Sequence, residues 1–90
     1  VRMSDTVVRV GGEEFIVIFK NSTLKGALQA CEKIRISIED HRLASVGQQT
    51  ISIGLTSVKS KENIEEVVKR ADKALYEAKR NGRNQVVVKK

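Results

Sequence analysis

The sequence predicts an α/β protein in which two helices pack on a β-sheet, and three observations lead to that prediction. Two runs rich in Val, Ile and Phe, residues 6–10 and 15–19, lie on either side of a Gly-Gly pair. Two longer segments carry apolar residues at helical spacing, and each is followed by another short apolar run. The resulting order is strand, strand, helix, strand, helix, strand, which is typical of helices packed on a sheet.

The first two strands and the glycines between them predict a β-hairpin. Thr6–Val10 is a short Val-rich segment, and Gly11 and Gly12 break the pattern as a tight turn. Phe15–Phe19 is apolar at every position, which predicts a strand covered on both of its faces.

The middle of the chain predicts a helix from about residue 23 to 41, followed by a strand over Gln49–Val58. In that strand, apolar residues alternate with small or polar ones. The helix has a single apolar stripe, which consists of Leu24, Ala27, Leu28, Cys31, Ile34 and Ile38.

A second helix is predicted from Ile64 to about Arg80. Asn63 is the expected N-cap, and Glu66 stands three positions later, where a capping box has its acidic partner. Gly82 is the expected stop, and residues 86–88, all Val, predict the last strand. The apolar stripe consists of Ile64, Val67, Val68, Ala71, Ala74, Leu75 and Ala78.

Composition limits the function classes. The chain has 90 residues, enough for one small domain, and no apolar stretch near the ~20 residues of a membrane span. The single cysteine excludes an internal disulfide and agrees with a reducing cytoplasm. The net charge of +6 favours anionic partners such as nucleotides, although a solvated basic surface explains it equally well. Aromatic residues make up 3%, which argues against nucleic-acid binding by base stacking.

The hairpin turn combines conformational freedom with negative charge. Gly11 and Gly12 allow a sharp turn and the close approach of a large ligand. Glu13 and Glu14 can bind a hard divalent cation through oxygen, and one of them can accept a proton from an attacking hydroxyl. Such a cation would stabilise the charge of a transferring phosphate. The alternative is an ordinary Gly-Gly hairpin with solvated acidic residues.

Four segments, in order and with matching spacing, resemble the GGDEF family of diguanylate cyclases. They are RVGGEEFIVIF at 9–19, ISIG at 51–54, ADKALYEAK at 71–79 and GRN at 82–84. The resemblance implies a nucleotidyl-cyclase-like fold, the ferredoxin-like palm, with helices on a mainly antiparallel sheet. It also implies the condensation of two GTP molecules into cyclic di-GMP with release of pyrophosphate. That reaction needs Mg²⁺ or Mn²⁺ and two facing domains, here in the cytoplasm or the cytoplasmic part of a membrane-bound sensor.

The resemblance also implies a role for individual residues. Glu13 would be a metal ligand that also activates the hydroxyl, and Glu14 would assist at the metal. Gly11 and Gly12 would make room for the nucleotide. Lys79 and Arg83 would hold the terminal phosphates, which suits their chemistry; the alternative is a basic helix end stabilised by the helix dipole. The family name specifies Asp where Glu13 stands, but Glu also occurs there in active members.

A second site is implied just before the hairpin. Arg2 and Asp5 match the Arg-x-x-Asp motif at the offset where the family binds its product, cyclic di-GMP, as an inhibitor. Lys33 on the following helix would be the second basic residue, in a place where the family more often has Arg. A surface ion pair is the alternative explanation of Arg2 and Asp5.

The resemblance starts late in the family's domain, so residues 1–90 are expected to be a partial GGDEF domain. The missing part would include a first strand with an Asp metal ligand, between the hairpin and the strand at 51–55, and the helices that recognise guanine. Two expectations follow: the chain alone does not cyclise GTP, and its sheet closes directly or pairs with another chain, for example by strand exchange. A non-catalytic GGDEF domain that senses cyclic di-GMP or GTP is the alternative function, and a small nucleic-acid-binding module is less well supported.

Overall fold

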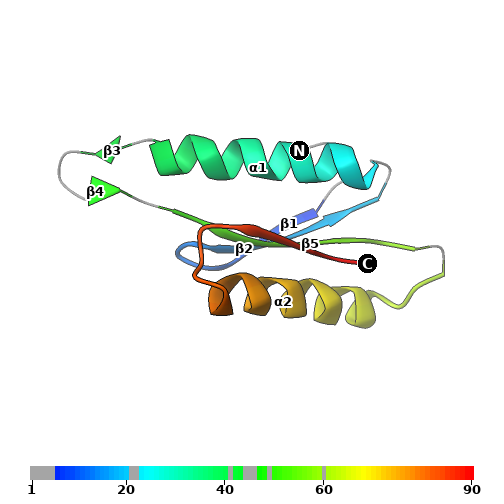
Figure 1. The fold of residues 1–90 in the computed structure, drawn as a ribbon. Coiled ribbons are helices and arrows are strands. Elements are labelled where there is room, and N and C mark those ends of the chain that lie inside the picture. Colours follow the sequence, from blue (N-terminus) through cyan, green and yellow to red (C-terminus); the bar gives the residue numbers. More distant parts are fainter. Residues whose placement is uncertain (1–5, 21–22, 41, 44–46, 49, 60) are drawn as a thin grey trace.

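The chain folds into two helices on opposite sides of one β-sheet (Figure 1). The computed structural model describes residues 6–20, 23–40, 42–43, 47–48, 50–59 and 61–90. The elements are β1 (Thr6–Gly11), β2 (Glu14–Phe19), α1 (Leu24–Asp40), β3 (Arg42–Leu43), β4 (Gly47–Gln48), β5 (Ser52–Ser57), α2 (Ile64–Arg80) and β6 (Val86–Lys89).

These bounds confirm each predicted element to within a few residues. The hairpin, both helices and the two later strands lie where the sequence places them. Sequence analysis did not predict β3 and β4, two-residue strands that pair with each other as a second small sheet. Neither described helix combines the length and the apolar character needed to cross a membrane.

The main sheet has the strand order β1-β2-β5-β6 and confirms the α/β class, but the expected antiparallel character is wrong. Only β1 and β2 pair antiparallel, whereas β2 pairs with β5 and β5 with β6 in parallel. The cause is connectivity: α1 and α2 are crossover helices, and strands joined by such a crossover run in the same direction. From the sequence, a complete domain is expected to have a further strand between the hairpin and the strand at 51–55. In the described sheet, β2 and β5 pair directly instead, with Phe15 opposite Ile53.

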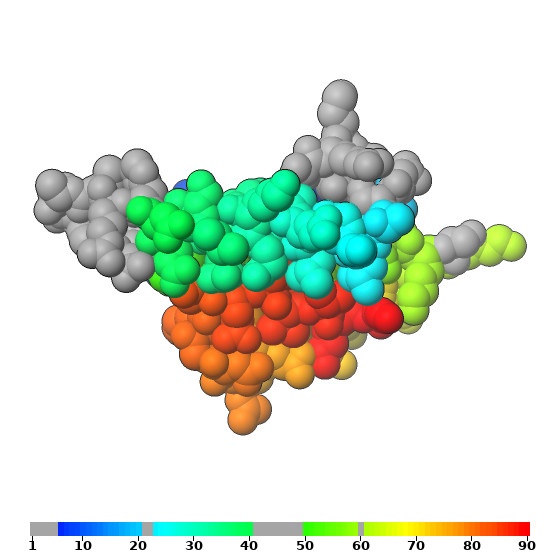
Figure 2. Space-filling view, turned by 45° about the horizontal axis from the view of Figure 1, so that its top comes forward, coloured from blue at the N-terminus to red at the C-terminus, as the bar shows by residue number. Residues whose placement is uncertain are grey.

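The core lies on both faces of β2 and β5. Ile16 and Ile18 of β2 face α2, where they pack against three of its buried residues. Val17 and Phe19 face the other way and join a cluster with α1 and β5. Figure 2 shows the residues of α1, in cyan and green, against the C-terminal segment in orange and red. The fully apolar run of β2 is therefore buried on both sides, as the sequence predicts.

The outer strand β1 is much less covered. Its valines, Val7, Val8 and Val10, have exposed fractions of 47%, 42% and 52%. β1 stands at the end of the strand order, so β2 is its only neighbour within the described sheet.

Helix α2 lies unusually close to β5. A Cβ atom placed on Gly54 would be 2.4 Å from both Ala71 O and Leu75 N. Arg70 also ties the helix to the strand, donating from Nη2 to Ser57 O at 2.6 Å and from Nε to Thr56 Oγ1 at 2.7 Å. The Arg70 guanidinium pairs with Glu62 and lowers the pKa of that carboxyl to about 2. The position of α2 along β5 is therefore fixed by backbone contact and by these polar contacts.

We expect Gly54→Ala to lower the free energy of unfolding by about 3 kcal/mol, the upper part of the range for overpacked cores. The new methyl group would collide with helix backbone, which cannot move aside as a side chain can. Urea unfolding followed by far-UV circular dichroism measures the change. Gly12→Ala is the matched control, because its Cβ would meet no atom within 4 Å and should change stability by less than about 0.5 kcal/mol. Equal effects of the two substitutions would contradict this reading of the α2–β5 contact.

Candidate functional site

The site residues gather at one end of the sheet, where the β1–β2 turn meets the first residues of β5 and the segment between α2 and β6. The backbone joins these parts: Ser52 N donates to Glu13 O at 2.9 Å, and Ile53 N donates to Gln85 O at 3.0 Å. Three segments far apart in the sequence are thus held together before any side chain contributes.

At this end, two basic side chains hold the carboxylate of Glu14. Lys79 Nζ lies 3.2 Å from Oε1, and Arg83 Nη1 donates to Oε2 at 3.0 Å. Both contacts lower the pKa of Glu14 below its ordinary value, the hydrogen bond from Arg83 most and that from Lys79 next. Because two cations face one carboxylate, the cluster keeps a surplus positive charge. The Arg83 side chain is 57% exposed and can therefore contact a ligand from solvent.

Lys79 and Arg83 owe their positions to the end of α2. Lys79 lies in the last helical turn, and Asn81 is the C-cap. Gly82, with φ +111°, and Arg83, with φ +64°, then turn the chain back toward the hairpin. Arg83 N donates to Ala78 O at 2.8 Å and Gly82 N to Lys79 O at 3.4 Å, the two bonds of a Schellman motif. The glycine predicted to stop α2 therefore also directs Arg83 toward Glu14.

The hairpin turn is stiffened by Arg9. Its guanidinium donates from Nε to Gly11 O at 3.1 Å and from Nη2 to Gly12 O at 3.0 Å. A Cβ atom on Gly11 would come within 3.2 Å of Glu14 Oε1, whereas one on Gly12 would meet nothing within 4 Å. Gly11 thus leaves space for the Glu14 carboxylate, and Gly12 leaves open space beside the turn.

The two glutamates of the hairpin do not lie together. Glu14 belongs to the side of the sheet that carries α2, where its cationic partners are. Glu13 is exposed and lines a cavity of about 370 Å³ on the α1 side, together with Ser37 and Thr50. No ion pair joins Glu13 to any residue in the described parts of the chain.

Because Glu13 and Glu14 lie apart, the described residues offer few ligands for a metal ion. Among them, no group of three or more His, Cys, Asp or Glu side chains could hold one. Both oxygens of Glu14 already face cations, so Glu13 is the one hairpin carboxylate without such a partner among the described residues. Mg²⁺ commonly takes one or two protein carboxylates together with substrate phosphates. The described residues alone therefore do not form a site for Mg²⁺ or Mn²⁺.

The expected product-binding residues are only partly visible. Arg2 and Asp5 lie outside the described residues. Lys33 is exposed on the outer side of α1.

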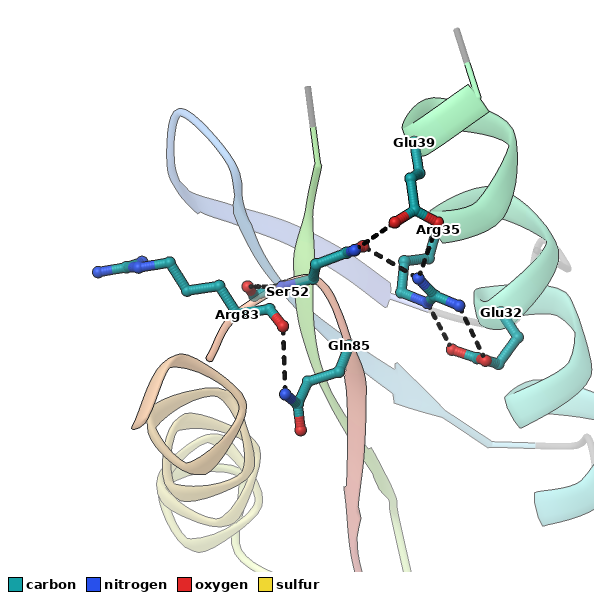
Figure 3. A network of polar contacts seen from close by, with 7 residues as sticks. Glu32, Arg35, Glu39, Ser52, Arg83 and Gln85 are labelled. Atoms are coloured by element: carbon teal, nitrogen blue, oxygen red, sulfur yellow. Dashed lines mark hydrogen bonds and ion pairs between the residues drawn. The ribbon is translucent and has the colours of Figure 1, made fainter. Parts of the chain in front are cut away.

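Sequence analysis gave no role to a polar network behind Arg83. Asn84 contacts Arg35 and Glu39 of α1 through its side chain and Ser52 of β5 through its backbone. Figure 3 shows these three partners, with Arg35 and Glu39 on the helix and Ser52 on the sheet. Its φ of +48° is left-handed, a conformation that Asn adopts more readily than most residues. The sequence signal for this role is the position of Asn84, directly after the Gly82-Arg83 pair that follows the predicted helix.

Comparison with known proteins gives consistent results. The family model described as "Diguanylate cyclase, GGDEF domain" matches residues 1–85. The chain is 45% identical to Diguanylate cyclase A of Treponema denticola and 41% identical to Diguanylate cyclase DgcM of Escherichia coli. These alignments cover 99% and 96% of this chain but only 25% and 21% of the two relatives.

A solved structure agrees with both the fold and the sequence comparison. The GGDEF domain of DgcB from Caulobacter crescentus, crystallised in complex with c-di-GMP, superimposes with a TM-score of 0.75 at 30% identity. The match covers 97% of this chain and 54% of that one.

The Glu14 contacts predict a perturbed titration. In the wild-type chain the pKa of the Glu14 carboxyl should lie below its ordinary value, and Arg83→Ala should raise that pKa by removing the contact that lowers it most. NMR detection of the Glu14 side-chain carboxyl carbon against pH measures both. Arg80→Ala is the control, because the Arg80 guanidinium lies over the Tyr76 ring instead. An unchanged Glu14 titration in Arg83→Ala would show that this pair does not form in solution.

Proposed function

Because the chain belongs to the GGDEF diguanylate cyclase family, we propose that it forms part of a domain that condenses two GTP molecules into cyclic di-GMP with release of pyrophosphate. The chain spans only 25% and 21% of the two curated relatives named above, so the reaction is proposed for a longer protein. Residues 1–90 would be the C-terminal part of the cyclase domain. The proposal rests above all on the cluster of Glu14, Lys79 and Arg83.

In this proposal, Lys79 and Arg83 bind the terminal phosphates of GTP. A guanidinium matches phosphate oxygens with paired donors, and an ammonium acts as a point charge. Both groups lie at the open end of the sheet and carry more positive charge than Glu14 balances. Their contacts would also stabilise the charge that develops on the departing pyrophosphate.

When no nucleotide is bound, Glu14 forms ion pairs with both Lys79 and Arg83. Its carboxylate presents two oxygens, one to each cation, as two phosphate oxygens would. A triphosphate carries more charge than a carboxylate and would displace it. Glu14 is thus proposed to hold the side chains of Lys79 and Arg83 in place. It also competes with the phosphates of the ligand for these two cations.

Glu13 is proposed to accept the proton of the attacking 3′-hydroxyl, since it is exposed and has no cationic partner among the described residues. The family typically uses Mg²⁺, which would supply charge neutralisation at the phosphates. Since the described residues do not complete a metal site, the remaining ligands are proposed to come from elsewhere in the longer protein. For the same reason the 90-residue chain alone is proposed to be inactive. Catalysis is proposed to require two complete domains that face each other.

One observation favours a second candidate, a non-catalytic domain that binds cyclic di-GMP or GTP as a sensor. The described residues offer cations for phosphate, but of the two hairpin carboxylates only Glu13 has no ion pair with a basic side chain, and no group of three possible metal ligands is found among them. Arg2, Asp5 and Lys33 are the proposed contacts for cyclic di-GMP. Binding of cyclic di-GMP by a longer protein that makes no product would support this candidate over the enzyme.

We expect the 90-residue chain to bind GTP, measured by isothermal titration calorimetry. Lys79→Ala and Arg83→Ala should each weaken binding about tenfold, the usual effect of losing a charge-assisted hydrogen bond. Glu14→Gln should tighten binding, because the competing charge is gone. Lys69→Ala, which removes an exposed charge elsewhere on α2, is the control. An equal loss of affinity in Lys69→Ala would contradict a specific site. It would mean that GTP binds through the general positive charge of the chain.

A product assay accompanies the binding measurement. The 90-residue chain incubated with GTP and Mg²⁺ should form no cyclic di-GMP by chromatography. Product formation would contradict the proposal that the chain is an incomplete active site.

A further inference from the structure

We propose that Asn84 is a positioning residue that directs Arg83 into the anion site, and that α1 is what holds Asn84 in place. The phosphate-binding part of this inference rests on the proposed function. Its geometric part, the hold on Arg83, does not.

The backbone around Arg83 is in an unfavourable conformation that needs support. Arg83 and Asn84 are consecutive non-glycine residues with φ of +64° and +48°. A left-handed conformation costs roughly 1–2 kcal/mol for an ordinary residue, and less for Asn. The Schellman bond from Arg83 N to Ala78 O fixes only the entry to this turn. The peptide between Arg83 and Asn84 must be fixed from its other side.

Asn84 supplies that second support with three polar groups. Its backbone N donates to Ser52 Oγ at 3.1 Å, and Ser52 is buried. Its side-chain Oδ1 accepts from Arg35 Nη1 at 3.0 Å, while Nδ2 donates to Glu39 Oε2 at 2.6 Å. An amide side chain satisfies both requirements at once, because its oxygen accepts from a cation and its nitrogen donates to an anion.

The α1 side of this contact is itself braced. Arg35 Nε donates to Glu32 Oε1 at 2.9 Å, and Arg35 Nη1 lies 3.5 Å from Glu39 Oε1. The Arg35 side chain is only 15% exposed, and the carboxylates around it raise its pKa. Figure 3 shows Glu32, Arg35 and Glu39 projecting from the helix toward the β5–β6 end of the sheet, with Arg83 directed away from them. Asn84 thus links a helix on one face of the sheet to a cation that serves the other face.

The exit from the turn is fixed as well. Gln85 Nε2 donates to Asn81 O and to Arg83 O, both at 3.1 Å. With the peptide groups on both sides of Arg83 held, its side chain leaves the backbone in one direction, toward Glu14. A guanidinium that is already directed loses less conformational entropy when it binds an anion.

The test uses inorganic triphosphate as the probe and the intact 90-residue chain. Asn84→Gly keeps access to the left-handed conformation but removes the amide contacts, and it should weaken triphosphate binding roughly fivefold, the cost of ordering one long side chain on binding. In an Arg83→Ala background the same substitution should have no further effect, because Asn84 acts through Arg83. Losses that simply multiply in the double variant would make Asn84 a structural residue only and overturn the proposal.

Three further variants test the contact between Asn84 and α1. Glu39→Ala removes the acceptor of the Asn84 amide and should weaken triphosphate binding, whereas Glu39→Gln keeps an acceptor oxygen and should restore most of it. Asn84→Asp keeps the acceptor for Arg35 but puts a carboxylate beside Glu39, so it should behave like Asn84→Gly. It also serves if Asn84→Gly fails to fold, which thermal unfolding reports.

A ligand-free measurement separates this inference from the proposed function. The side-chain Nε–Hε NMR signal of Arg83 should shift in Asn84→Gly and stay in place in the control Lys69→Ala. If the wild-type chain binds no triphosphate, the proposed function fails and this signal alone decides the inference. If the wild type binds and Arg83→Ala weakens binding but Asn84→Gly changes neither affinity nor signal, the inference is overturned and the proposed function stands.

Discussion

The close approach of α2 to β5 at Gly54 is the constraint on which the anion site depends. With helix backbone at 2.4 Å from the place of a Gly54 Cβ, the helix cannot slide along the strand. From Leu75 to Lys79 the helix advances about 6 Å, and from Gly54 back to Ser52 the strand covers about 6.6 Å. Lys79 therefore reaches the level of Ser52, whose partner on β2 is Glu14. The glycine at position 54, which lets the helix approach β5 closely, thus sets the position of the Lys79 ammonium at the end of the sheet.

Charge and strand geometry together explain why the two hairpin glutamates differ. Side chains alternate between the faces of a strand, so neighbours in the sequence meet different surroundings. Glu14 faces the side where α2 ends and meets two cations, whereas Glu13 lies beside the cavity under α1. The motif supplies two carboxylates in sequence, but the fold gives one to an anion site and leaves the other facing solvent.

Local features were predictable from sequence and long-range pairings were not. The hairpin turn, the Asn63 cap and the Gly82 stop all depend on a few neighbouring residues, and all three are observed, with the turn at Gly12 and Glu13 and with Gly11 as the last residue of β1. The family resemblance implied roles for Lys79 and Arg83, but not that Glu14 would occupy both cations. The direct pairing of β2 with β5 does not follow from local sequence, because it depends on segments more than thirty residues apart and on what lies between them. Asn84 belongs to the matched segment GRN, but local sequence gives it no role, since its partners on α1 lie 45 and 49 positions away.

The exposed strand β1 has a consequence for the behaviour of the protein at high concentration. Natural sheets commonly protect an outer strand with lysine, proline or a covering segment. β1 holds three half-exposed valines, and its one charged residue, Arg9, turns its guanidinium back onto the hairpin. Among the described residues, no strand pairs with the outer edge of β1, so this edge offers backbone groups to which another strand can add. The surplus positive charge of the chain opposes such pairing only through general repulsion. Salt screens this repulsion between chains. The tendency of the chains to associate through β1 therefore increases with the salt concentration.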